Sequence, residues 1–180
     1  MLTPTEGKIL INGKSVGVET KKIISYLPER TYLNKQMKVV EVLDYFSDFY
    51  DNFDKGKALK LLKDLDLDVN MNLSKMSKGM QEKVQLVLVM SRSADLYILD
   101  EPLGGVDPAT RDYILDTILS NFKENASVII STHLISDIER ILDEVVFIDK
   151  GKIILQSEAD KLRTKESASI DEVFRRMFKC

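Results

Sequence analysis

The chain has almost no cysteine, and this limits the chemistry it can carry. Its single cysteine, Cys180, is the last of 180 residues. No disulfide can therefore form within the chain, and no cysteine-rich zinc site is available. A lone cysteine is typical of a protein in a reducing compartment.

An excess of positive charge is also lacking. Lysine and arginine total 26 against 29 aspartates and glutamates, which gives a formal net charge of −3. A protein that binds duplex nucleic acid needs a concentrated basic face to neutralise phosphates, so no nucleic-acid partner is expected. Hydrophobic residues make up 44% of the chain and charged residues 31%. That balance supplies a core for one domain and argues against wholesale disorder.

Long apolar runs are absent as well. A bilayer-spanning helix needs roughly 18 or more apolar residues. The stretch from Val84 to Met90 is far shorter and contains Gln85. The opening residues, Met1 to Gly7, do not have the basic and then apolar pattern of a signal peptide. We therefore expect a soluble, cytosolic protein.

The first half of the chain predicts short strands followed by helices. Residues 7–13 and 22–27 are apolar runs of β type, and both are closed by turn residues. From Val39 to Tyr50, and again from Ala58 to Leu65, apolar residues follow helical spacing. The stretch from Ser77 to Ser91 predicts a buried helix with Ser77 as its N-cap.

The second half alternates strands and helices. Strands are predicted over residues 96–99 and 128–131, with helices between and after them and a hairpin over residues 145–155. Asp107 and Pro108 predict the start of a helix whose buried stripe includes Leu115, Ile118, Leu119 and Phe122. Such alternation favours a parallel sheet covered by helices.

Two adjacent carboxylates, Asp100 and Glu101, follow the apolar strand Leu96-Tyr-Ile-Leu99. Ligands of a parallel α/β sheet bind beyond the carboxyl ends of its strands. Phosphoryl chemistry uses one acid to hold Mg²⁺ and a second to polarise the attacking water. An isolated Asp-Glu pair is more often a solvated strand end, but the buried strand before it and the loop after it favour the functional interpretation.

Three other short motifs lie near predicted strand or helix ends. Ser77-Lys78-Gly79-Met80 opens a helix, where free amides form an anion site, although a serine N-cap needs no ligand. His133, the only histidine, follows the strand 128–131 and is expected on the same side as Asp100; a lone histidine is otherwise more often a surface residue. Glu29 follows Leu27-Pro28 and, taken alone, is an exposed acid in a turn.

The order of these motifs resembles the nucleotide-binding domain of ATP-binding cassette (ABC) transporters. The resemblance runs from Gly7-Lys-Ile to Lys150-Gly-Lys-Ile. It implies an α/β fold: a P-loop NTPase-like parallel sheet with flanking helices, an inserted helical subdomain and a small antiparallel β portion. It also implies that residues 1–180 form a single truncated ABC ATPase domain, with the helical subdomain at about residues 36–92.

The resemblance implies a role for each matching residue. Asp100 would be the Walker B acid that serves Mg²⁺, Glu101 the general base or water-positioning carboxylate, and His133 the switch histidine. Asp107 matches the D-loop acid that helps to join two subunits.

Two motifs depart from the usual family pattern. The signature motif contacts the γ-phosphate of ATP on the opposite subunit, and here it reads Met76, Ser77, Lys78, Gly79, Met80 in place of Leu-Ser-Gly-Gly-Gln. Glu29 stands where the family usually has the Q-loop glutamine. It keeps an oxygen for metal or water but adds charge and loses the amide donor.

The 180 residues contain no G-x-x-x-x-G-K-[ST] motif, because Gly104-Gly105 is not followed by Lys and Ser or Thr. This P-loop supplies the amide cradle, a lysine for the β- and γ-phosphates and a hydroxyl for Mg²⁺. We interpret the chain as starting after the P-loop, with the N-terminal strand and P-loop helix missing. A natural loss is less favoured, because Asp100, Glu101 and His133 would then have no phosphate to serve. Without that strand and helix, the remaining core should expose an apolar face, and such a face should favour self-association.

The expected function is that of the ATP-binding subunit of an ABC transporter, an ATPase with ATP and Mg²⁺ as cofactors. It would act as a homo- or heterodimer with a second nucleotide-binding subunit, drive a membrane permease and lie in the cytoplasm at the inner face of the membrane. Alone, the chain is expected to be impaired for lack of the P-loop. The alternative is a non-catalytic module that completes a partner's nucleotide site. An ATPase of DNA repair or translation would need coiled-coil heptads or a tandem cassette, and neither is present.

Overall fold

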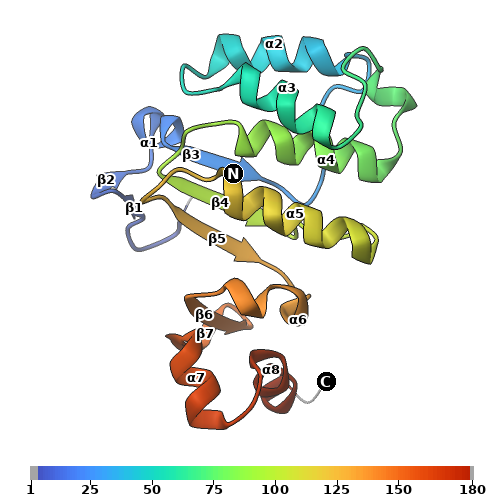
Figure 1. Cartoon of the computed structure of the whole chain (residues 1–180). Helices are drawn as coiled ribbons and strands as arrows, with labels where there is room; N and C mark the ends of the chain where they lie inside the picture. Colours follow the sequence, from blue (N-terminus) through green and yellow to red (C-terminus); the bar gives the residue numbers. More distant parts are fainter. Residues whose placement is uncertain (1–3, 179–180) are drawn as a thin grey trace. The chain divides into compact units, whose positions relative to one another are not determined.

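The computed structural model of the chain describes residues 4–178 (Figure 1). Its packing divides the chain into two compact units, residues 1–131 and 132–180. The first unit contains a parallel sheet and its helices, and the second contains an antiparallel hairpin with its own helices. The predicted α/β class, with a parallel sheet, flanking helices and a small antiparallel portion, is confirmed.

The parallel sheet has the strand order β3-β4-β5, formed by Ile24–Leu27, Leu96–Asp100 and Ser127–Ser131. Strand alternation gives it two different faces. Tyr97 and Leu99 on one face are buried, whereas Tyr26 and Ile129 on the other are 48% and 53% exposed. The three strands run in the same direction, so their carboxyl ends share one edge of the sheet.

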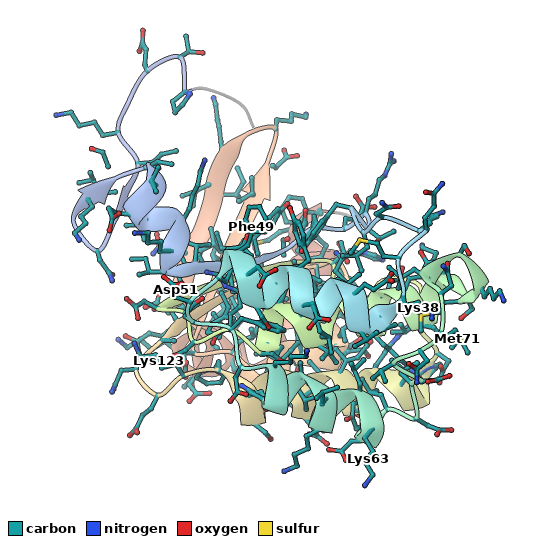
Figure 2. The ribbon with its side chains drawn as sticks, turned by 90° about the horizontal axis from the view of Figure 1, so that it is seen from above. Lys38, Phe49, Asp51, Lys63, Met71 and Lys123 are labelled. Carbon is teal, nitrogen blue, oxygen red and sulfur yellow. The ribbon has the colours of Figure 1, made fainter. Side chains whose placement is uncertain are left out.

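Three helices form the helical lobe: α2 (Val39–Phe49), α3 (Lys55–Asp64) and α4 (Lys78–Met90), with the short 3₁₀ helix η1 (Leu73–Lys75) before α4. In Figure 1, α4 lies between the sheet and the other two helices. Figure 2 shows Lys38 and Phe49 at opposite ends of α2, with Met71 beside Lys38. The Met71 carbonyl accepts a 3.1 Å hydrogen bond from the amide of Val39.

The core of the helical lobe is a cluster of apolar side chains from all three helices. Its buried members are Val39, Val42, Leu43, Phe46, Ala58, Leu61, Leu62, Leu67, Leu73, Met76, Val84, Val87 and Leu88. Each fully buried large aliphatic side chain contributes about 1.5–3 kcal/mol. Because α4 supplies residues to this cluster and also packs on β3, it joins the lobe to the sheet.

Arg92, just after α4, is buried and ties the lobe to the start of β3. Its Nη1 and Nη2 donate to the carbonyls of Ile24 at 2.6 Å and Lys22 at 2.9 Å. Its Nε donates to Oδ1 of Asn52 at 3.1 Å, and its guanidinium lies 3.8 Å from the ring centre of Tyr50. A planar group with several fixed donors suits this meeting point of three segments.

The segment 7–13, predicted as a short strand or hairpin arm, contributes to a small hairpin. Strands β1 (Leu10–Ile11) and β2 (Lys14–Ser15) pair antiparallel around Asn12 and Gly13, whose φ angles are 49° and 74°. Positive φ at both central residues is typical of a type I′ turn. A short helix, α1 (Val18–Lys22), follows where no element was predicted.

Helix α5 (Pro108–Asn121) begins after Asp107 as predicted, but its buried stripe differs. Ile114, Leu115 and Ile118 are buried, whereas Leu119 is 43% exposed. Leu119 lies about 40° past Leu115 around the helix axis, on the side away from Ile114 and Ile118, which takes it beyond the edge of the buried stripe.

The second unit is a hairpin covered by helices. Strands β6 (Glu144–Asp149) and β7 (Lys152–Glu158) pair antiparallel, and α7 (Ala159–Glu166) and α8 (Ile170–Phe178) follow. The helix predicted after the strand 128–131 is a short α6 (Ile135–Ile138) continued by η2 (Glu139–Ile141). Phe147, Phe174 and Phe178 form the aromatic centre of this unit. Across residues 4–178, no helix has both the length and the apolar character needed to cross a bilayer.

Candidate functional site

The carboxyl ends of β3, β4 and β5 lie side by side at one edge of the parallel sheet, and polar residues lie at or directly after each end. Leu27 of β3 pairs with Leu99 of β4, and Asp100 pairs with Ser131 of β5. The loop that contains Glu29 begins right after β3, and Glu29 itself is exposed. The sequence placed Asp100, Glu101 and the Pro28-Glu29 loop at strand ends, and the register of the sheet puts these ends side by side.

Asp100, the last residue of β4, is held by a hydroxyl from the neighbouring strand. Ser131 Oγ donates a 2.6 Å hydrogen bond to Asp100 Oδ1. Ser131 was not among the predicted site residues, although it opens the Ser131-Thr-His motif. Only the cross-strand register shows that it orients the carboxylate.

Glu101 adopts a left-handed backbone conformation, with a φ of 48°. A non-glycine residue takes this conformation uncommonly, at turns and at functional sites. The amide of Glu101 donates to the Ser131 carbonyl at 2.8 Å, and its own carbonyl accepts from the amide of Gly104 at 3.0 Å. These two hydrogen bonds fix a sharp turn directly after the strand and hold the backbone of Glu101 next to β5.

The N-terminus of α4 presents the signature residues Ser77, Lys78, Gly79 and Met80. Ser77 is the predicted N-cap, and its Oγ accepts a 3.2 Å hydrogen bond from the amide of Met80. Lys78 is exposed and pairs with Glu82 at 3.4 Å. A Cβ built on Gly105 would lie 3.4 Å from Lys78 Nζ. The Lys78 side chain therefore reaches the loop that follows Glu101.

Asp107 is the N-cap of α5. Its Oδ1 accepts from the amide of Thr110 at 3.0 Å, and its Oδ2 accepts from Oγ1 of Thr110 at 2.6 Å. These hydrogen bonds stabilise the ionised form and lower the pKa of the Asp107 carboxyl. This residue is thus an ionised, exposed cap.

His133 belongs to the second unit, two residues after β5, and is exposed. Its expected place beside Asp100 stays a prediction from the sequence.

The oxygen donors at the sheet edge suit Mg²⁺ in kind. This ion is bound through one or two carboxylates together with phosphate and water oxygens, so a large acidic cage is not needed. Asp100, oriented by Ser131, supplies a carboxylate of this type. Within residues 4–178, no three or more His, Cys, Asp or Glu side chains converge as a metal cluster.

Comparisons with known proteins identify relatives of the chain. An uncharacterised ABC transporter ATP-binding protein of Methanocaldococcus jannaschii is 32% identical over 82% of this chain and 55% of its own length. The uncharacterised ABC transporter ATP-binding protein YhaQ of Bacillus subtilis is 28% identical over 91% of this chain and 56% of its own length. The chain thus spans about half the length of these curated relatives.

A solved structure of an ATP-binding subunit of an ABC transporter superposes on 97% of this chain and 78% of its own. Its TM-score is 0.85 and its sequence is 27% identical. The family model described as "ABC transporter" matches residues 1–104, more than half of the chain. The chain therefore belongs to the ABC transporter family, among its ATP-binding proteins.

Proposed function

We propose that these residues form part of the ATP-binding subunit of an ABC transporter, in which MgATP binding and hydrolysis at a subunit dimer drive transport by a membrane permease. The observation that carries this proposal is the shared edge of β3, β4 and β5. There Asp100 is oriented by Ser131, and Glu101 follows in a fixed turn. The names of the relatives support the ATP-binding part of the proposal.

In this proposal, each of the predicted site residues has one task. Asp100 would hold Mg²⁺, an ion that supplies positive charge for the transferred phosphate when bound, and Ser131 would keep the Asp100 carboxylate in place. Glu101 accepts a proton from the attacking water or orients it, while His133 hydrogen-bonds the terminal phosphate. Glu29 adds an oxygen for metal or water at the end of β3.

The N-terminus of α4 serves the second nucleotide of the dimer. Its unpaired amides and the positive end of the helix dipole favour a phosphate. Ser77, Lys78, Gly79 and Met80 would contact the γ-phosphate of ATP on the opposite subunit. Asp107, exposed at the start of α5, would help to join the two subunits.

The exposed surface of the helical lobe is proposed to meet the permease. Tyr45 and Phe49 on α2 are 50% and 65% exposed, and their rings lie 4.5 Å apart. Exposed aromatic pairs are typical of protein contact surfaces. Such a contact would hold the subunit in the cytoplasm at the inner face of the membrane.

The second candidate is a non-catalytic module that completes a partner's nucleotide site. It is favoured by one contrast: the 180 residues contain an ordered signature helix but no P-loop motif. A chain of this kind would present Ser77 to a nucleotide held by another subunit and would not itself hold ATP tightly.

Calorimetric titration of the 180-residue chain with MgATP tests these proposals. We expect weak binding and negligible hydrolysis, because the P-loop supplies most phosphate contacts. Micromolar binding with turnover that Glu101→Gln abolishes would contradict the expected impairment and support a complete catalytic site. A titration of the chain into an ATP-loaded ABC subunit that has its own P-loop distinguishes the second candidate. In that case binding should depend on ATP and should be lost in Ser77→Arg.

A further inference from the structure

Gln85 is a polar residue in the most buried part of α4. It lies within the run Val84–Met90, all of which is buried, and it is only 3% exposed itself. Its Nε2 donates a 3.1 Å hydrogen bond to the carbonyl of Pro28. The contact joins residues 57 positions apart in the sequence and reaches the loop that contains Glu29.

The surroundings of Gln85 do not favour a carboxamide for packing alone. Among the residues that the structure describes, its buried Oε1 has no hydrogen-bond partner. An unsatisfied buried polar atom is unfavourable, and an apolar side chain of similar shape would avoid that loss. The property that distinguishes Gln85 from such a side chain is therefore its donor to Pro28.

A second hydrogen bond joins the same two elements one helical turn further on. Ser25 Oγ donates to the Val89 carbonyl at 2.8 Å, and both residues are buried. Strand β3 and its loop are thus fastened to α4 at two levels. Of the two contacts, that of Gln85 is next to Glu29 and is the nearer to Ser77 at the N-terminus of α4.

We propose that Gln85 is a positioning residue that holds the Pro28-Glu29 loop to α4. The placement of the Glu29 carboxylate then follows that of the helix whose N-terminus carries Ser77. The significance for nucleotide chemistry rests on the proposed function, whereas the link itself does not. Hydrogen exchange needs no nucleotide, so failure of ATP binding and failure of the link are separate results.

Hydrogen exchange measured by mass spectrometry tests the link in the variant Gln85→Met. We expect amide exchange over residues 29–33 to become about fivefold faster, as expected for one lost buried hydrogen bond. Trypsin cleavage after the exposed Arg30 should accelerate in parallel. Unchanged exchange over residues 29–33 in the folded variant would overturn the proposal.

Gln81→Met is a matched control on the same helix. Gln81 Nε2 also donates to backbone carbonyls, those of Leu73 at 3.0 Å and Met76 at 3.1 Å. This variant should accelerate exchange around residues 73–76 and leave residues 29–33 unchanged. If both variants loosen both segments equally, Gln85 has only a general structural role and the proposal fails.

Gln85→Glu keeps the test decisive if the methionine variant does not fold. A protonated carboxyl group can donate to the Pro28 carbonyl, whereas a carboxylate cannot. Protection factors over residues 29–33 should therefore be close to those of the original chain at acid pH and fall when the glutamate ionises. Protection that is the same in both protonation states would contradict the proposal.

Discussion

Ser131 Oγ and Asp100 Oδ1 lie 2.6 Å apart across two parallel strands. The bond connects the last residues of β4 and β5, where a nucleotide site is proposed. A hydroxyl that donates to a carboxylate leaves the other carboxylate oxygen available to a metal ion.

Ser131→Ala removes the hydroxyl that orients Asp100. We expect a loss of about 1 kcal/mol in the free energy of unfolding, because a partly exposed carboxylate loses one charge-assisted hydrogen bond. Urea denaturation measures this change. Ser127→Ala, an exposed position at the other end of β5, is the matched control and should be close to neutral. Equal losses in the two variants would show that the Ser131 hydroxyl has no specific role.

Arg92→Met should destabilise the chain by about 3 kcal/mol. The variant removes the guanidinium hydrogen bonds to the carbonyls of Lys22 and Ile24 and the cation–π contact with Tyr50, although the Lys22 carbonyl still accepts a 3.1 Å hydrogen bond from Asn52 Nδ2. Arg92→Lys should give an intermediate loss, because an ammonium cannot reach the same acceptors at once. Denaturant unfolding measures both, with the exposed Arg30→Met as control. A loss of under about 0.5 kcal/mol in the free energy of unfolding would show that Arg92 does not tie the helical lobe to β3.

The stability of the chain should depend on Asp107 at acid pH. Its hydrogen bonds to Thr110 lower the pKa of the carboxyl from the ordinary 3.8. The unfolded chain therefore binds the proton more readily. The stabilisation is complete above pH 3.8 and is lost as the pH falls through the lower folded pKa. In Asp107→Asn, which keeps an oxygen for the cap, the midpoint of thermal unfolding should fall less steeply between pH 5 and about pH 2.5. Parallel pH curves for the two proteins would refute this.

The exposed face of the parallel sheet should promote self-association. Tyr26 and Ile129 project from this face, and parallel sheets are normally covered on both sides. Light scattering at tens of micromolar should show species larger than a monomer, and Ile129→Lys should reduce them. The control Leu119→Lys changes an exposed residue on α5 and should leave association unchanged. A clean monomer for the original chain would contradict the prediction.

The strand ends could be predicted from the sequence because local patterns define them. Asp100 and Glu101 follow a short apolar run, and Ser77 precedes a long one, so each lies at a boundary that periodicity alone reveals. The same reasoning located Asp107 as a helix cap.

The contacts between elements could not be predicted in this way. The partner of Asp100 depends on the register of β4 against β5, and the contact of Gln85 with Pro28 depends on how α4 packs on β3. The prediction that Leu119 is buried was wrong for a related reason, because helical spacing identifies a buried stripe but not its edges. These features arise from tertiary packing, and a single sequence carries little trace of them.

The N-cap of α4 is a serine, and this choice has a consequence for any anion that reaches the helix. The Ser77 oxygen already accepts a hydrogen bond from the Met80 amide, but its own proton is still available to donate. An aspartate would cap the helix equally well, yet it would offer only acceptors and a negative charge. With serine, the same oxygen atom can cap the helix and donate a hydrogen bond to a phosphate. Binding and release of that anion therefore need not unwind the first turn of α4.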